Sequence, residues 1–147
     1  MVEIIRQAES MDVDKIISFL TDAKLNCDGI KEMIDYFVLS EDEEGNITAV
    51  LGIEPVQGIG VLRSLAIRST VKEEGLVQLF QHVYNLAKSK KLPTLMLITN
   101  KEAFIPLLQF MGFERIANNA IPKELEYSTH VKQISGLDGV FFMKRAI

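Results

Sequence analysis

The sequence has few of the cysteine and histidine residues that disulfides and metal sites require. Cys27 is the only cysteine among 147 residues, so no disulfide can form within the chain and a thiolate zinc cluster is excluded. Two separated histidines and one cysteine do not make a metal site, and neither a Walker loop nor a Ser-His-Asp signature occurs. Such sparse cysteine use fits a reducing compartment.

Positive charge is also in short supply. The chain has 16 Lys and Arg against 20 Asp and Glu, a formal net charge of −4. Proteins that bind nucleic acids depend on Lys and Arg to neutralise phosphates, so this partner class is excluded. The densest basic group is Lys88, Lys90 and Lys91, at the end of a predicted helix, where cations offset the helix dipole.

Long hydrophobic runs are missing as well. The apolar pair Val38-Leu39 soon meets the acidic residues 41–44, and no apolar stretch approaches the roughly 20 residues that cross a membrane. The first residues lack the pattern of a signal peptide. We therefore expect a cytoplasmic protein with no membrane partner.

What the sequence does contain is enough for one globular domain. Hydrophobic residues make up 48% of the chain and charged residues 24%, which suffices for a core and a soluble surface. The length is typical of one domain, and repeats, low-complexity tracts and linkers are not evident. We expect residues 1–147 to form a single domain.

Hydrophobic periodicity and turn signals predict strands mixed with helices. A helix capped by Ser10 is predicted, followed by a short helix near 30–37, a long helix with an apolar stripe at 76–87, and a short helix at 104–111 with Pro106 in its first turn. Strands are predicted at 2–6, 37–39, 47–53, 61–67, 94–99, 113–117 and 139–145, and 121–134 is read as a loop with a helical turn. This order predicts an α/β (α+β layered) domain with a mixed sheet.

One segment joins a strand, a loop and the start of the long helix. Leu65-Ala66-Ile67 ends the strand, Arg68 to Val71 follows, and Lys72-Glu73-Glu74-Gly75-Leu76-Val77 opens the helix. This segment resembles the strand and the pyrophosphate loop, Gln/Arg-x-x-Gly-x-Gly/Ala, of the GNAT superfamily of N-acetyltransferases. Phe110-Met111-Gly112-Phe113 resembles the Leu-Gly-Phe that follows the fifth strand of that family. The resemblance implies a GNAT-like, mixed and mostly antiparallel sheet flanked by helices.

A narrower resemblance involves the segments Leu62 to Ile67 and Gly52-Ile53-Glu54-Pro55. They are similar to the arsenic-operon-associated acetyltransferases and to the amino-acid N-acetyltransferase domain of arginine biosynthesis. The resemblances imply an N-acetyltransferase that uses acetyl-CoA and acts on a small amine, such as an amino acid or its analogue. They also imply a monomer or a homodimer.

The resemblance assigns coenzyme A to two sets of residues. Leu65, Ala66 and Ile67 would bind the pantetheine arm through the strand backbone, and the Ile67 N–H would polarise the thioester carbonyl. The pyrophosphate would lie on the unpaired N–H groups of the helix N-terminus, where the dipole favours an anion and a glycine lets the backbone approach closely. The loop residues so assigned are Lys72, Glu73, Glu74, Gly75, Leu76 and Val77.

The loop departs from the family pattern at several positions. Lys72 replaces Gln or Arg, and Val77 replaces Gly or Ala. Glu73 and Glu74 repel a pyrophosphate, although in the first turn of a helix each carboxylate contributes about 0.3–1 kcal/mol to helix stability. Leu108 stands where many GNATs have a tyrosine as general acid. These departures leave open a degenerate GNAT-fold binding or regulatory module without transferase activity, and a larger acyl-CoA as donor.

Glu54 and Tyr127 are the candidate catalytic residues. Glu54 follows the apolar strand segment 49–53, where partial burial would make it a stronger base; the alternative is an exposed glutamate at a strand end. Tyr127, and His130 beside it, lie in the late segment where such domains place substrate contacts. Tyr127 would act as an acid or shape the pocket, and the alternative for both is a surface role.

Three further side chains have two readings each. Arg63 either faces the cleft and binds a substrate carboxylate or faces water. Cys27 is read as a small buried apolar residue rather than a nucleophile, since no histidine partner lies nearby in sequence. His82 is expected to face solvent.

Overall fold

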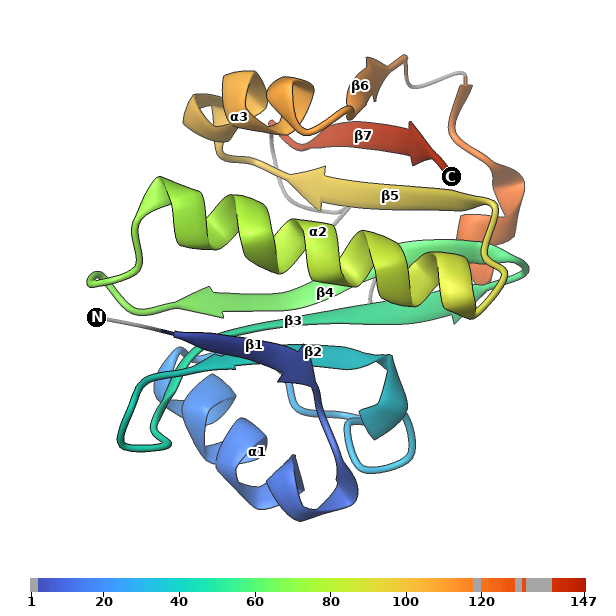
Figure 1. The fold of residues 1–147 in the computed structure, drawn as a ribbon. Coiled ribbons are helices and arrows are strands. Elements are labelled where there is room, and N and C mark those ends of the chain that lie inside the picture. Colours follow the sequence, from blue (N-terminus) through green and yellow to red (C-terminus); the bar gives the residue numbers. More distant parts are fainter. Residues whose placement is uncertain (1–2, 118–119, 129–130, 132–138) are drawn as a thin grey trace. The chain divides into compact units, whose positions relative to one another are not determined.

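The order of helices and strands is the one that the sequence predicts, except that a 3-10 turn replaces the short helix expected near 30–37 (Figure 1). The computed structural model describes residues 3–117, 120–128, 131 and 139–147. Its helices are α1 (Val13–Asp22), α2 (Glu73–Ser89) and α3 (Ile105–Phe110), with short 3-10 turns η1 (Ser10–Asp12), η2 (Ile34–Tyr36), η3 (Glu102–Phe104) and η5 (Lys123–Tyr127). Its strands are β1 (Ile4–Gln7), β2 (Phe37–Glu41), β3 (Ile47–Val56), β4 (Ile59–Ile67), β5 (Thr94–Thr99), β6 (Glu114–Ile116) and β7 (Phe141–Ala146).

The strands form a seven-stranded sheet in the order β1-β2-β3-β4-β5-β7-β6. Strands β1 and β2, β2 and β3, β5 and β7, and β6 and β7 pair antiparallel. Strands β4 and β5 pair in parallel, from Ile59 opposite Thr94 to Val61 opposite Met96. The sheet is therefore mixed and mostly antiparallel, and the predicted fold class is confirmed.

The chain divides into two compact units. The first unit comprises residues 1–54 and 63–86, and so holds β1, β2, α1 and most of β3 and α2. The second unit comprises residues 55–62 and 87–147, and so holds β5, β6, β7 and α3.

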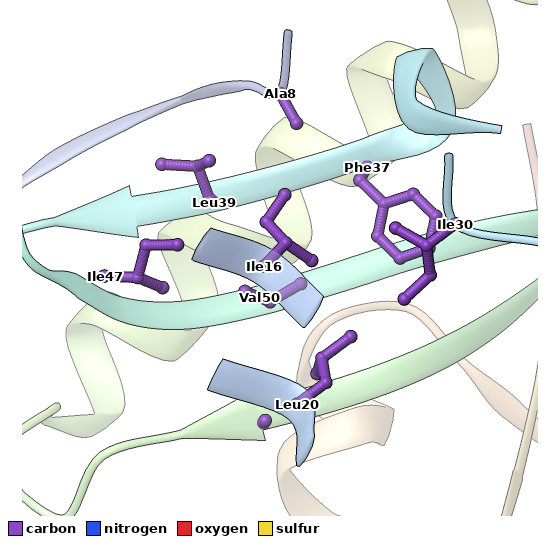
Figure 2. Close-up of a cluster of buried hydrophobic side chains, with 9 residues drawn as sticks. Ala8, Ile16, Leu20, Ile30, Phe37, Leu39, Ile47 and Val50 are labelled. Carbon is purple, nitrogen blue, oxygen red and sulfur yellow. The ribbon is translucent and has the colours of Figure 1, made fainter. Parts of the chain in front are cut away.

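The core of the first unit joins α1 to strands β2 and β3. Ile16 and Leu20 lie one helical turn apart on α1 and are fully buried against Phe37 and Leu39 of β2 (Figure 2). The cluster is completed by Ala8, Ile30, Ile47, Val50 and Ala66. Residues Val38, Ala49 and Leu51 point to the opposite face of the strands and are buried too, so both faces of this part of the sheet are covered.

Helix α2 confirms the prediction of a long amphipathic helix. Its apolar stripe is buried along its whole length, through Leu76, Leu79, Phe80, Val83, Leu86 and Ala87. The helix starts three residues before that stripe, at Glu73, and the Leu76 N–H donates to the Lys72 carbonyl at 3.1 Å. The stripe packs the helix against the core, whereas Glu73 and Glu74 of its first turn are exposed.

In the second unit, the strand β5 and the end of α3 follow the sequence signals closely. Strand β5 has the predicted bounds 94–99, and Pro106 lies in the first turn of α3. Gly112, with φ of +96°, ends α3 in the left-handed region that favours glycine. The buried cluster of this unit is Val56, Val61, Met96, Ile98, Leu125, Val131 and Phe142.

Two local predictions are corrected. Ser10 does not cap α1, because the chain first forms the 3-10 turn η1, which begins at Ser10. The side-chain cap at this point is made by the buried Asp12, whose carboxylate accepts the Glu9 N–H at 2.8 Å. The predicted helix near 30–37 is only the 3-10 turn η2, because the chain must be extended again at Phe37 to enter β2.

A partly buried group of ion pairs connects β1, η1 and β2. The Arg6 guanidinium, on β1, donates to both carboxylate oxygens of Asp12 at 2.7 and 2.8 Å and to Glu41 of β2 at 2.8 Å. Asp12 is 4% exposed. The hydrogen bonds that Arg6 donates hold the pKa of Asp12 below its ordinary value, and the same bonds to Asp12 and Glu41 raise the pKa of Arg6.

We predict that Asp12→Asn lowers the free energy of unfolding at pH 7 by about 1–3 kcal/mol, because it leaves a half-buried guanidinium without its main partner. Since the pKa of Asp12 is lowered by folding, its contribution is fully present above its ordinary value of 3.8 and disappears as the pH falls through the folded value. Urea unfolding at pH 7 and pH 3 measures both effects. The exposed Asp14→Asn is the matched control, and an equal loss in both variants would contradict the prediction.

Candidate functional site

The predicted coenzyme segment folds as a strand, a tight turn and a helix within the first unit. Strand β4 ends at Ile67, and the Arg68 N–H donates to the Thr48 carbonyl of β3 at 2.9 Å. The Val71 N–H then donates to the Arg68 carbonyl at 3.0 Å, which turns the chain into α2. The N–H groups that precede Leu76 have no partner within the helix, so they point partial positive charge out of its N-terminus.

A cavity of about 490 Å³ lies at this helix N-terminus. It is lined by Glu3, Thr70, Lys72, Glu74, Gly75 and Gln78. The structure thus brings together three of the predicted loop residues, namely Lys72, Glu74 and Gly75. A Cβ atom on Gly75 would lie 3.2 Å from Val71 Cγ1, a tight contact. Glycine at this position avoids that contact and adds no side chain to the cavity.

Three lining residues, Glu3, Thr70 and Gln78, are not among the predicted site residues, and Glu3 is the one that lies far away in the sequence. Its Oε2 atom accepts the Ser40 hydroxyl at 3.0 Å and would lie 3.8 Å from a Cβ on Gly75. The two residues are 72 positions apart in the sequence, and only the pairing of β1 with β2 brings Glu3 to the loop. The side chains of the cavity therefore include two carboxylates, Glu3 and Glu74, and one cation, Lys72.

The other predicted loop residues have different environments. Glu73 is exposed, Val77 is half-buried, and Leu76 is 5% exposed because its side chain belongs to the apolar stripe. Leu76 therefore offers the site its backbone and not its side chain.

The end of β4 presents its backbone to two sides. Successive N–H groups of an extended chain point in opposite directions, and the Arg68 N–H points to β3. The Ile67 N–H accordingly points away from β3. Leu65 is half-buried, Ala66 is packed in the core cluster, and Ile67 is 37% exposed.

The middle of β4 is distorted next to Arg63. Ser64 has a φ of +59°, a left-handed conformation that costs a non-glycine residue energy. The Arg63 Nε donates to Ser64 Oγ at 3.0 Å, and one terminal nitrogen lies 3.5 Å from the Asn26 carbonyl. The half-buried Arg63 side chain therefore lies across the loop after α1 and is neither fully in water nor, among the described residues, in an ion pair.

The two candidate catalytic residues are placed to different extents. Glu54 is half-buried on β3, which continues to Val56 and so extends past the predicted strand end. The backbone of Tyr127 ends η5, but its side chain and all of His130 lie outside what the structure describes. The roles of Glu54 and Tyr127 stay predictions.

Cys27 and His82 match their non-catalytic readings. Cys27 is half-buried, packs against the core of the first unit, and has its Sγ 3.7 Å from the Ile17 carbonyl. His82 is exposed on α2, with Nδ1 3.0 Å from the Gln78 carbonyl.

The described ranges contain neither a metal-ligand cluster nor a membrane-spanning helix. Over residues 3–117, 120–128, 131 and 139–147, no group of three or more His, Cys, Asp and Glu is placed to hold a metal ion. Within the same ranges, none of the helices has the length and apolar character needed to cross a membrane.

Comparison with known proteins gives one relative in sequence. No family model matches the chain. The uncharacterized protein YwlB of Bacillus subtilis (strain 168) is 35% identical over 143 residues, which cover 97% of this chain and 96% of YwlB.

Solved structures of acetyltransferases resemble the chain in fold. Rv2747 from Mycobacterium tuberculosis, solved with coenzyme A, is 16% identical with a TM-score of 0.74 and covers 98% of this chain and 99% of its own. A GNAT-family acetyltransferase from Staphylococcus aureus Mu50 is 16% identical with a TM-score of 0.70, covering 99% of each chain. N-acetylglutamate synthase from Neisseria gonorrhoeae, solved with coenzyme A and N-acetyl-glutamate, is 16% identical with a TM-score of 0.73; the match covers 99% of this chain but 35% of the synthase. The chain therefore has the GNAT fold.

We predict that the conformation of Ser64 makes position 64 sensitive to branching at Cβ. Ser64→Val should lower the free energy of unfolding by about 1–3 kcal/mol, because a β-branched residue is poorly tolerated at positive φ. Ser64→Gly, which accepts that φ, should cost less than about 1 kcal/mol. Urea unfolding of both variants checks this, and a Val variant as stable as the Gly variant would show that position 64 is not held at positive φ.

Proposed function

The chain belongs to the family of YwlB and has the GNAT fold, and from this premise we propose that it is an acetyl-CoA-dependent N-acetyltransferase acting on a small amine, such as an amino acid or its analogue. One observation carries the proposal: a cavity lies at the N-terminus of α2, lined by Thr70, Lys72, Glu74 and Gly75 of the segment that resembles the coenzyme site of the superfamily. Three of the solved structures with this fold contain coenzyme A.

The residues present fit coenzyme A through the backbone. The N–H groups of Glu73, Glu74 and Gly75 would bind the pyrophosphate, with Lys72 as the adjacent cation. Leu65, Ala66 and Ile67 would bind the pantetheine arm along the strand. When bound, acetyl-CoA supplies an activated acetyl group with a thiolate as leaving group.

The chain's own groups would act on the proton and the developing charge. The Ile67 N–H, which points away from β3, would donate to the carbonyl oxygen on which negative charge develops. Glu54 would accept the proton of the attacking amine, directly or through water. Tyr127 would supply a proton or shape the pocket, and Arg63 would bind an acceptor carboxylate. In this proposal the protein is cytoplasmic and is a monomer or a homodimer.

A second candidate is a GNAT-fold binding or regulatory module that has lost transferase activity. It is favoured by the two carboxylates, Glu3 and Glu74, that share the cavity with Lys72. Both carboxylates oppose the pyrophosphate, whereas the backbone N–H groups attract it. A larger acyl-CoA as donor is a variant of the first candidate.

We predict that calorimetric titration with acetyl-CoA at modest salt gives a dissociation constant in the micromolar range. In the variant Glu73→Gln with Glu74→Gln, the affinity should rise about tenfold, because two repulsive charges near the pyrophosphate are removed. Glu102→Gln, an exposed glutamate of η3 in the second unit, is the matched control and should leave the affinity unchanged. No binding at millimolar acetyl-CoA in any of these proteins would contradict the transferase and favour the module.

We predict that Glu54→Gln lowers kcat for acetyl transfer by about 10²–10⁴, the usual contribution of a general base. The KM for acetyl-CoA should stay within about twofold, since Glu54 does not line the coenzyme cavity. Steady-state kinetics with the best amine from a screen measures both constants. An unchanged kcat would exclude Glu54 as the base, and the proposal that the protein binds coenzyme A would still stand.

A further inference from the structure

Strands β2 and β3 of the first unit contain an aromatic ring packed against a glycine, at a position where any other residue would clash with the ring. Phe37 is fully buried and is the cross-strand partner of Gly52. A Cβ atom at position 52 would lie 2.4 to 2.7 Å from three atoms of the Phe37 ring, which real Cβ atoms do not approach. The ring therefore lies flat over the Gly52 backbone, and a side chain at position 52 would push it away.

Arg63 also approaches the Phe37 ring. The Arg63 guanidinium carbon lies 5.8 Å from the centroid of the Phe37 ring, within the roughly 6 Å over which a ring attracts a cation. Among the described residues, the guanidinium also contacts the Ser64 hydroxyl and the Asn26 carbonyl. Both are neutral, so the contacts of Arg63 with described residues direct its fork without cancelling its charge.

This geometry suits a cation that is kept for an anionic ligand. A guanidinium binds a carboxylate in two parallel hydrogen bonds only if its plane is held in a fixed orientation. A flat aromatic surface supplies that orientation without competing for the hydrogen-bond donors, as a carboxylate partner would. Asn26, whose carbonyl it contacts, is exposed and the Arg63 side chain is only half-buried, so the cation is accessible from one side.

We propose that Phe37, seated on Gly52, is a positioning residue that orients Arg63 and thereby makes the acceptor site selective for amines that bear a carboxylate. The inference rests on the proposed function, and it assigns the selectivity to two buried residues that need not touch the acceptor. The Phe37 ring sets the plane of the guanidinium, and Gly52 sets the position of the ring.

The test uses the full chain and a panel of the common L-amino acids, each as the free acid and as its α-amide. The wild type should prefer free acids over amides in kcat/KM by at least about tenfold. In Phe37→Leu this preference should fall at least about fivefold, through a higher KM for the acids, with the constants for the amides unchanged. Gly52→Ala should have the same effect, because its Cβ displaces the ring.

The control is Phe113→Leu, the same change at a buried phenylalanine of the second unit. It should cost comparable stability in urea unfolding and leave the preference intact. A preference that survives Phe37→Leu, or that Phe113→Leu removes equally, overturns the inference. So does a wild type that acetylates acids and amides alike, although the proposed function would stand.

A second measurement separates the inference from the transferase activity. The NMR signal of the Arg63 Nε–H, identified by its loss in Arg63→Lys, should carry a ring-current shift that Phe37→Leu removes. If no amine of the panel is acetylated, the amino-acid acceptor of the proposed function fails, and the inference is then decided by titration. Free amino acids, but not their amides, should shift this signal in the wild type and not in Phe37→Leu; equal responses would overturn it.

Discussion

The first unit depends on one guanidinium that is shared between two carboxylates. Arg6 holds Asp12, where α1 begins, and Glu41, where β2 ends. Because these contacts fix α1 against the strands, Ile16 and Leu20 meet the core of the unit. Arg6 also lies three residues after Glu3, so the pairing that places Arg6 beside β2 places Glu3 at the start of α2. The cavity at the start of α2 and the candidate acceptor residue Arg63 thus both belong to the unit that Arg6 stabilises.

The start of α2 combines two opposing electrostatic contributions. The backbone N–H groups and the helix dipole attract an anion, while Glu73, Glu74 and Glu3 repel it. Glu73 and Glu74 also stabilise the first turn of the helix, so the loop keeps its shape without a bound phosphate. Affinity for an anion and stability of the loop are therefore in competition here. Replacing a glutamate would raise the affinity for an anion and lower the stability of the first turn, without changing the backbone N–H groups.

The sequence predicted those features that local patterns determine. The stripe from Leu76 to Ala87 identified α2, Pro106 and Gly112 marked the limits of α3, and the run from Thr94 to Thr99 gave the bounds of β5. The segment from Leu65 to Val77 led to a helix N-terminus with a cavity, since that arrangement is also local.

Two of the features that were missed depend on pairing between distant segments. Glu3 reaches Gly75 only through the pairing of β1 with β2, and Phe37 meets Gly52 only through the register of β2 and β3. The conformation of Ser64 had no signal either, because serine is not a residue that marks positive φ. Register depends on turn geometry as well as on the hydrophobic pattern, so these contacts could be found only in three dimensions.

The acidic start of α2 has a kinetic consequence for the proposed transferase. An enzyme whose coenzyme affinity is held down by its own carboxylates works below saturation over a wide concentration range, and there its rate is proportional to the acetyl-CoA supply. Flux through such an enzyme would have a high elasticity toward acetyl-CoA and would rise and fall with the carbon status of the cell. The same glutamates that make the helix stable would then set how closely the reaction follows metabolism.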